Sequence, residues 1–366
     1  MIQSIFIYIF LTLVMYLLCR RGSIINNWNL VVIAVAIYAL VFGVRYGVGM
    51  DYFSYLDAYL HGDNSILSKE QGFILLINSL HFLGAHFSVF FGIVAFAQLI
   101  LCFRLIKNTP EVYPWLVLSF MLSGQWLVFG NGLRQEVAFA IFAMSLIFIK
   151  NDNKKLDILF HFLFIVLAVL FHLSAAILFA ISIALIIKKE WFHNIKIQLL
   201  IYVIAFFFPG INAITMFFDR FDYLIELLGY DRYVEDEARE SLLYKNTQLR
   251  LGFYIIQMIN LICIINSNKV KQYFKDKLPV LSIYNLFFVG ILWGFLFGSS
   301  QLLNRINYYF YQFQFIFAAL TMTYLFKNKK KNICYILLIC YTLLFAARMF
   351  RAETNTAIFR FFWDYI

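Results

Sequence analysis

Apolar runs of about 16 to 20 residues recur along the whole sequence, and they constrain the fold more than any other feature. As an α-helix, such a run is just long enough to cross the ~30 Å hydrocarbon core of a bilayer. Hydrophobic residues make up 63% of the chain and charged residues only 14%, whereas a soluble domain is roughly 45–50% apolar. We therefore exclude a soluble globule and expect an all-α polytopic membrane protein.

The runs that lie between charge clusters predict about twelve transmembrane helices. The apolar segment from Gly72 to Leu83 is too short to cross, so it predicts a short interfacial or re-entrant helix on the external side. We expect one integral membrane domain over residues 1–366, with external loops at about 45–86 and 219–250, and no cleaved signal peptide. The predicted spans are 2–18, 28–44, 87–103, 115–130, 134–149, 156–172, 173–187, 197–217, 251–266, 279–298, 306–326 and 333–347.

The connections between these spans differ in charge from one side to the other. Eighteen of the 30 basic residues fall on one side, which the positive-inside rule makes cytoplasmic, and both termini then lie outside. Fifteen of these eighteen are Lys, whereas ten of the twelve external basic residues are Arg. The planar guanidinium binds phosphate with two parallel hydrogen bonds, so an external phosphate ligand is one interpretation. The other is that these Arg pair with the fifteen external carboxylates.

Several function classes lack support in the sequence. The net charge of +10 follows from topology and does not favour nucleic-acid binding, which needs a basic folded surface. The five cysteines form no C-x-x-C pair, and neither a phosphate-binding glycine loop nor a paired-acid metal loop is present. We therefore expect no metal, no cofactor and no nucleic acid.

Two external motifs surround candidate arginines. The first runs from Arg45 to Tyr55 (RYGVGMDYFSY), where two glycines permit a sharp turn that brings Arg45 and Asp51 within reach of each other and of a ligand. A snorkelling Arg and a helix N-cap Asp are the structural alternative. In the second motif, a tight turn over residues 131–133 precedes Arg134 at a helix start, which favours an anion site. Glu136 is the alternative, purely structural partner of Arg134.

Two further motifs lie later in the chain. His172 lies in the turn Phe171–Ser174, and histidine is the residue type suited to take a proton from a sugar hydroxyl near neutral pH, although a structural histidine is equally consistent. Arg305 opens a later span and repeats the geometry of Arg134, so the two can converge on one diphosphate if their helices are neighbours. Aromatic residues of the 219–250 loop are candidates for stacking on sugars. Supporting candidates are Tyr52, Tyr55, Gln135, Ser174, Tyr308, Tyr230 and Tyr233.

Four short patterns of this chain resemble, in the same order, motifs of the EpsG-like branch of the Wzy-type O-antigen and exopolysaccharide polymerases. The patterns are R-x-G-x-G-x-D-Y-x-x-Y, L-R-Q, F-H-x-S-A and N-R-x-x-Y-Y. The resemblance covers roughly residues 40 to 325. It implies a GT-C-like glycosyltransferase of the bacterial inner membrane. That enzyme transfers a growing glycan from undecaprenyl diphosphate to the non-reducing end of a new lipid-linked repeat unit, at the periplasmic face. A chain-length regulator is a partner implied by the family alone.

Under this interpretation Arg45, Arg134 and Arg305 stabilise the diphosphate leaving group, and His172 or Asp51 is the base. His172 is preferred, because an Asp beside Arg45 would be a poor base. Two other functions stay open: a flippase or transporter of lipid-linked oligosaccharide, and a membrane acyltransferase of surface glycans. No similarity between the two halves of the chain supports a repeat-built transporter.

Overall fold

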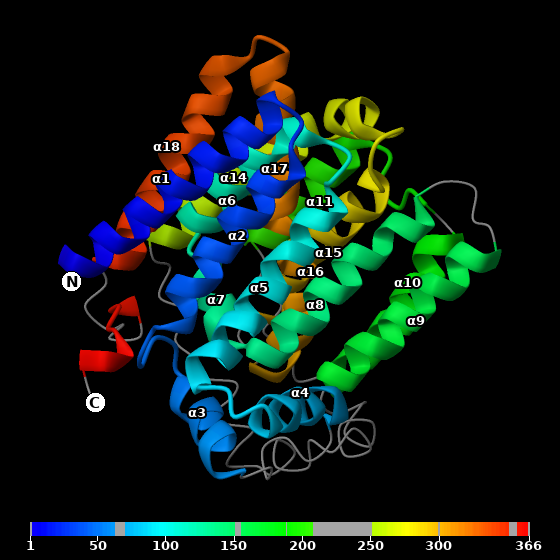
Figure 1. Cartoon of the computed structure of the whole chain (residues 1–366). Helices are drawn as coiled ribbons and strands as arrows, with labels where there is room; N and C mark the ends of the chain where they lie inside the picture. Colours follow the sequence, from blue (N-terminus) through cyan, green and yellow to red (C-terminus); the bar gives the residue numbers. More distant parts are fainter. Residues whose placement is uncertain are drawn as a thin grey trace.

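The structure is a computed structural model that describes residues 2–62, 70–150, 155–187, 189–207, 251–298, 301–350 and 357–364. Within these ranges the fold is a bundle of helices without a β-strand, which confirms the all-α prediction (Figure 1). The N-terminal half contains α1 (Ile2–Ile24), α2 (Trp28–Gly43), α3 (Tyr52–His61), α4 (Gln71–Phe82), α5 (Phe87–Leu105), η1 (Pro110–Val112), α6 (Tyr113–Leu122), α7 (Gln125–Asn131), α8 (Leu133–Ser145), η2 (Leu146–Ile149) and α9 (Lys155–Phe171).

The second half continues the bundle. Its elements are η3 (Leu173–Ala176), α10 (Ile177–Ile187), α11 (Ile195–Phe207), α14 (Leu251–Phe274), α15 (Val280–Phe297), α16 (Gln301–Tyr311), α17 (Phe313–Lys327), α18 (Lys331–Met349) and η6 (Phe362–Asp364).

Burial separates central helices from helices at the periphery. Every residue of α8, apart from Arg134, is buried, and α17 is buried from Phe313 to Leu325. In α9, by contrast, large apolar side chains such as Leu159, Leu163 and Leu170 recur at helical spacing and are exposed. Apolar groups that face outward on a long helix are suited to contact with lipid. The chain is therefore a multi-pass membrane protein with α8 and α17 at its centre.

The predicted count of twelve spans is not confirmed. By length and composition, five of the described helices can each cross a membrane, or six if a bent pair counts as one span. The predicted span 115–130 is that pair, Pro110–Leu122 and Gln125–Asn131, which meet at 70°. The span predicted over 306–326 is broken between α16 and α17 at Gln312. Other predicted spans are shorter helices, and the end of 197–217 lies outside the described residues.

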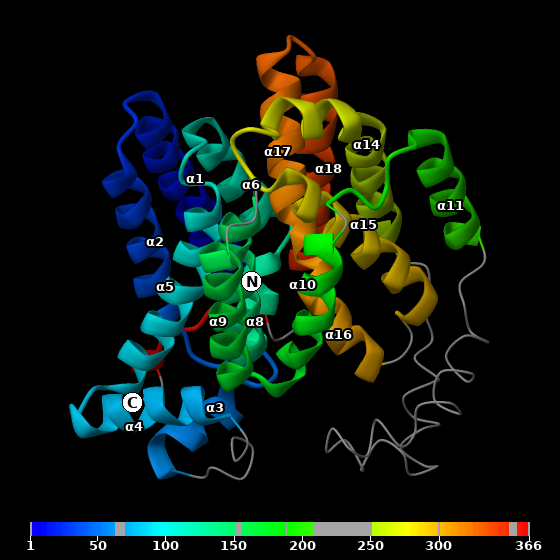
Figure 2. The ribbon, with the colours of Figure 1, turned by 90° about the vertical axis from the view of Figure 1, so that its right-hand side faces the viewer.

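One end of the bundle is covered by α3 and α4, which lie across it in both views (Figures 1 and 2). The short apolar helix α4 is where the sequence predicts an interfacial helix. The C-terminal segment lies at the same end, because Tyr46 N donates to Arg360 O at 2.8 Å and Phe362 N donates to Val44 O at 3.1 Å.

Candidate functional site

Three ionisable side chains meet where α4, α8 and α9 come together at this end of the bundle. Glu70 accepts hydrogen bonds with both carboxylate oxygens, Oε2 from Nη1 of Arg134 and Oε1 from Nδ1 of His172. An ionised carboxylate only accepts, so Nδ1 of His172 is the protonated ring nitrogen. No described residue forms a hydrogen bond with the other nitrogen, Nε2. We call these three residues the Arg–Glu–His cluster.

Local backbone structure brings the cluster together. Glu70 stands immediately before α4, and its main-chain carbonyl accepts from Phe73 N at 3.0 Å, which leaves the carboxylate available for other partners. A Cβ atom at Gly72 would lie 3.0 Å from the carbonyl oxygen of Leu170, so glycine lets α4 start against the last turn of α9. His172 follows that turn with an extended backbone. The predicted tight turn over Phe171–Ser174 is thus confirmed.

The cluster is mostly shielded from solvent. The side chains of Glu70, His172 and Arg134 are 7%, 13% and 17% exposed. Burial by itself raises the pKa of Glu70, but the hydrogen bonds and charges of His172 and Arg134 outweigh it and hold the pKa below its usual value. Glu70 is therefore ionised at neutral pH and fixes the orientation of both partners.

Arg134 makes further contacts with α3. Its Nε donates to the hydroxyl of Tyr55 at 3.3 Å, and its guanidinium carbon lies 5.7 Å from the centre of the Tyr55 ring. As predicted, Arg134 stands at the start of a helix just after the turn at Gly132. Its carboxylate partner is Glu70, whereas Glu136, the structural alternative, accepts from Nε2 of Gln312 at 2.9 Å.

The glycine-rich segment after α2 does make the predicted sharp turn, with φ of +65° at Gly47 and +103° at Gly49. Asp51 then contacts Asn131: its backbone N donates to Asn131 Oδ1 at 3.0 Å, and its Oδ2 accepts from Asn131 Nδ2 at 3.2 Å. Asp51 occupies the N-cap position of α3 without a side-chain capping hydrogen bond. The turn therefore places Asp51 against the last residue of α7, just before α8 begins.

Arg45 does not pair with Asp51, and its guanidinium is enclosed instead. Nη2 of Arg45 donates to the carbonyl of Gly130 at 2.8 Å, and only 1% of the residue is exposed. The rings of Phe42, Tyr52 and Phe91 surround its guanidinium carbon at 5.2–5.9 Å. Arg45 and Asp51 thus contact the last two residues of α7, Gly130 and Asn131.

The helices that carry Arg134 and Arg305 are neighbours, a point that the sequence left open. Nε2 of Gln135 in α8 donates to the main-chain carbonyl of Arg305 in α16. Partial burial raises the pKa of Asp51, and the positive charges of Arg305 and Arg134 act against that rise. Both guanidinium groups therefore lie in electrostatic range of one carboxylate.

A cavity of about 200 Å³ lies beside Asp51, between the glycine turn, α7, α8 and α16. This volume far exceeds the ~10–15 Å³ that one water requires. Glu136 belongs to its wall, and the Oε2 atom of this buried carboxyl group has no hydrogen-bond partner in the described part of the chain. The lining residues are Gly49, Met50, Leu127, Val128, Asn131, Gly132, Glu136 and Tyr308.

The other predicted residues have varied positions. Tyr52 is buried and donates to the carbonyl of Arg45 at 3.0 Å, so it supports the turn. Oγ of Ser174 lies 3.1 Å from the hydroxyl of Tyr309 in α16. Tyr230 and Tyr233, with the rest of the 219–250 loop, lie outside the described residues. Among the residues described, no three His, Cys, Asp or Glu side chains are grouped to hold a metal ion.

Sequence reasoning missed Glu70 and the role of Gln312. Glu70 is 64 residues from Arg134 and 102 from His172 in sequence, and no motif surrounds it. Its position directly before the short apolar helix was the one available signal. A lone acid in a loop has no spacing that reveals such distant partners.

The fold and this site define a multi-pass, all-α membrane protein with a cluster of charged side chains at one end of its helix bundle. The profile of the EpsG family matches residues 28–363, and the chain belongs to this family. The family indicates a membrane polysaccharide polymerase in general terms. Neither a curated protein nor a solved structure matches the chain, so the GT-C-like architecture stays a prediction.

The cluster generates a prediction about stability. Glu70→Gln keeps the shape of the side chain but leaves Arg134 without a carboxylate in a site with little solvent. Because hydrogen bonds to charged groups stabilise by about 1.5–3 kcal/mol each, we expect the thermal unfolding midpoint of the purified protein in detergent to fall by several degrees.

The matched control is Asp57→Asn. This carboxylate is 59% exposed and pairs with His61 one turn further along α3, so its loss should leave the midpoint nearly unchanged. Equal midpoints for Glu70→Gln and the unaltered protein would contradict the structural role of Glu70.

Proposed function

We propose that the chain is a polysaccharide polymerase that extends lipid-linked glycans at the external face of the bacterial inner membrane. The donor is a growing glycan on undecaprenyl diphosphate, and the acceptor is the non-reducing end of a new lipid-linked repeat unit. The observation that carries the proposal is the Arg–Glu–His cluster, which combines an oriented imidazole with a guanidinium in the matched region of an EpsG family member. A chain-length regulator is a proposed partner, implied by the family.

His172 is the proposed general base. Its Nδ1 proton is held by Glu70, so Nε2 carries the lone pair and takes the proton from the acceptor hydroxyl. The acceptor oxygen then bonds to the anomeric carbon of the donor, and the bond from that carbon to the diphosphate breaks. Asp51 is the alternative base, because partial burial raises the pKa of its carboxyl group, but its Oδ2 already accepts a hydrogen bond from Asn131.

Arg134 and Arg305 are the proposed partners of the diphosphate. Negative charge develops on this leaving group as the glycosidic bond breaks, and fixed cations in a site with little water stabilise that charge. The positive charges of both arginines act to lower the pKa of Asp51, and the two helices that carry them are neighbours. For Arg45 we propose a positioning role, because its guanidinium donates a hydrogen bond to the carbonyl of Gly130 and is enclosed by three aromatic rings.

The cavity beside Asp51 is the proposed site for the acceptor sugar. Its lining offers polar groups of the kind that bind sugar hydroxyls, namely Asn131, Glu136 and Tyr308. The buried Oε2 of Glu136 has no partner, and a sugar hydroxyl that donates to it would satisfy an atom whose isolation is otherwise costly. The volume suits a single sugar unit better than an oligosaccharide.

His172→Gln tests the base. Glutamine keeps a donor toward Glu70 but takes up no proton at neutral pH, so the transfer should slow by about 10²–10⁴-fold. In a strain deleted for this gene, a gel of surface polysaccharide should show a ladder with the unaltered protein. With His172→Gln it should show a single repeat unit.

His193→Gln is the control, because that side chain is 90% exposed, and its ladder should be normal. Full-length polymer from His172→Gln at normal protein abundance would refute the assignment. Loss of even the single-unit product in the deletion strain would favour a flippase, whereas a change confined to decoration of a full-length polymer would favour an acyltransferase.

Arg134→Lys tests the diphosphate partner. The positive charge is kept, but the ammonium cannot hold Glu70, the Tyr55 hydroxyl and a phosphate in the fixed geometry of a guanidinium. We expect polymerisation to slow by about 10²–10³-fold, comparable to the loss of one donor from an oxyanion site. Arg21→Lys, at the opposite end of the bundle, should leave the ladder unchanged, and a normal ladder from Arg134→Lys would contradict the proposal.

Val128→Trp tests the acceptor cavity. An indole at this position fills part of the space without removing a charged group, so we expect KM for the acceptor to rise at least tenfold in membranes supplied with lipid-linked repeat units. Val203→Trp, on the outward side of α11 where the side chain is 46% exposed, is the matched control. An unchanged KM for Val128→Trp would place the acceptor elsewhere.

A further inference from the structure

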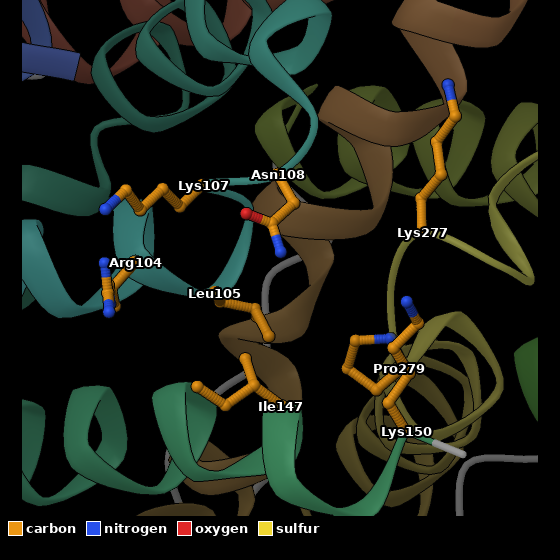
Figure 3. Close-up of a pocket in the computed structure, with 8 residues that line it drawn as sticks. All are labelled: Arg104, Leu105, Lys107, Asn108, Ile147, Lys150, Lys277 and Pro279. Carbon is orange, nitrogen blue, oxygen red and sulfur yellow. The ribbon is translucent and has the colours of Figure 1, made fainter.

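A second cavity lies at the opposite end of the bundle from the Arg–Glu–His cluster. It also measures about 200 Å³, and α5 and α8 both run from the cluster's end toward it. Figure 3 shows its lining, which comes from the end of α5 and the turn after it, the end of η2 and the connection between α14 and α15. Its lining residues are Arg104, Leu105, Lys107, Asn108, Ile147, Lys150, Lys277 and Pro279.

The cavity carries an excess of positive charge. Of its four basic side chains, Lys277 pairs with the carboxylate of Glu111 at 2.8 Å. Nζ of Lys150 donates to the main-chain carbonyl of Asp276 at 2.5 Å, and Nζ of Lys107 lies 5.5 Å from the centre of the Trp28 ring. In the described ranges no carboxylate contacts Lys150, Lys107 or Arg104. Three cations of the described residues thus line one small space without a carboxylate in contact with them, Arg104 and Lys107 on one side and Lys150 on the other (Figure 3).

The remaining lining complements these cations. The Asn108 amide lies between the α5 residues on one side and Lys277 and Pro279 on the other, where it offers a neutral donor (Figure 3). Leu105, Ile147 and Pro279 supply apolar contacts. Topology requires basic residues on one side of a membrane but does not require three segments to gather them around one cavity. An anion between them would relieve their mutual repulsion.

We propose that this cavity binds a phosphate group, supplied either by the headgroup of an anionic phospholipid or by a soluble phosphate compound. Basic pockets between helices at the lysine-rich face of membrane proteins bind phosphate headgroups, and Arg104 gives a planar fork that matches phosphate. The site is separate from the proposed glycan chemistry and does not depend on it. A phosphate bound in this cavity would contact the end of α5, the end of η2 and the connection after α14 at the same time.

The test uses the purified full-length protein and two kinds of probe. Native mass spectrometry compares retention of phosphatidylglycerol with retention of phosphatidylcholine, and thermal unfolding is followed with inorganic phosphate or pyrophosphate. The variant Arg104→Gln with Lys107→Gln removes two uncompensated charges. Its control, Arg20→Gln with Arg21→Gln, removes two exposed charges at the end of α1, on the same side but outside the cavity.

We expect retention of phosphatidylglycerol over phosphatidylcholine, and a loss of about fivefold in affinity for each charge removed from the cavity, with the control unchanged. Stabilisation by phosphate or pyrophosphate without lipid preference would identify a soluble ligand at the same site, provided that the cavity variant abolishes it. Equal retention of both lipids with no phosphate effect would overturn the proposal, as would equal losses in variant and control.

Discussion

The carboxylate of Glu70 is the group on which the candidate site depends. A charge at the end of an apolar helix bundle is costly unless it is paired, and here one carboxylate pairs with Arg134 and His172 at the same time. The pairing links the start of α4 to the start of α8 and the end of α9. It also sets the imidazole tautomer, because the acceptor at Nδ1 leaves Nε2 without a proton when the ring is neutral.

Burial distinguishes two arginines that the sequence presents as equivalent. Arg45 follows α2 and Arg134 lies at the start of α8, both near the same end of the bundle. Three aromatic rings enclose the guanidinium of Arg45, which donates a hydrogen bond to a main-chain carbonyl. Arg134 is 17% exposed and shares its carboxylate partner, Glu70, with His172. The first geometry suits a residue that holds a turn in place, and the second suits one that meets a ligand.

Sequence reasoning predicted what depends on local pattern. Apolar runs gave the helical class, and the spacing of glycines gave the turn that carries Asp51. The number of spans was not predicted in this way, because only uncharged residues, Ser123 and Gly124 at the bend and Gln312 at the break, interrupt these mostly apolar stretches, and no charge marks either point. Glu70 could not be assigned either, since its partners are set by how α4 packs on α9, an arrangement that involves Gly72 and Leu170.

Hydrogen bonds within the protein explain part of the preference for arginine over lysine at the predicted external end, which the sequence alone links to a phosphate ligand. Three arginines at this end each donate a hydrogen bond to a group on another helix or turn. Arg45 donates to the carbonyl of Gly130, and Arg348 donates to the carbonyl of Gly124. Arg134 donates to the carboxylate of Glu70. Arg134 uses a second donor on Tyr55 at the same time. A lysine offers one mobile ammonium and cannot serve several fixed acceptors in a plane. Internal bonding therefore accounts for arginine at these three positions, and the phosphate hypothesis concerns Arg134 and Arg305, whose positive charges both act on the carboxylate of Asp51.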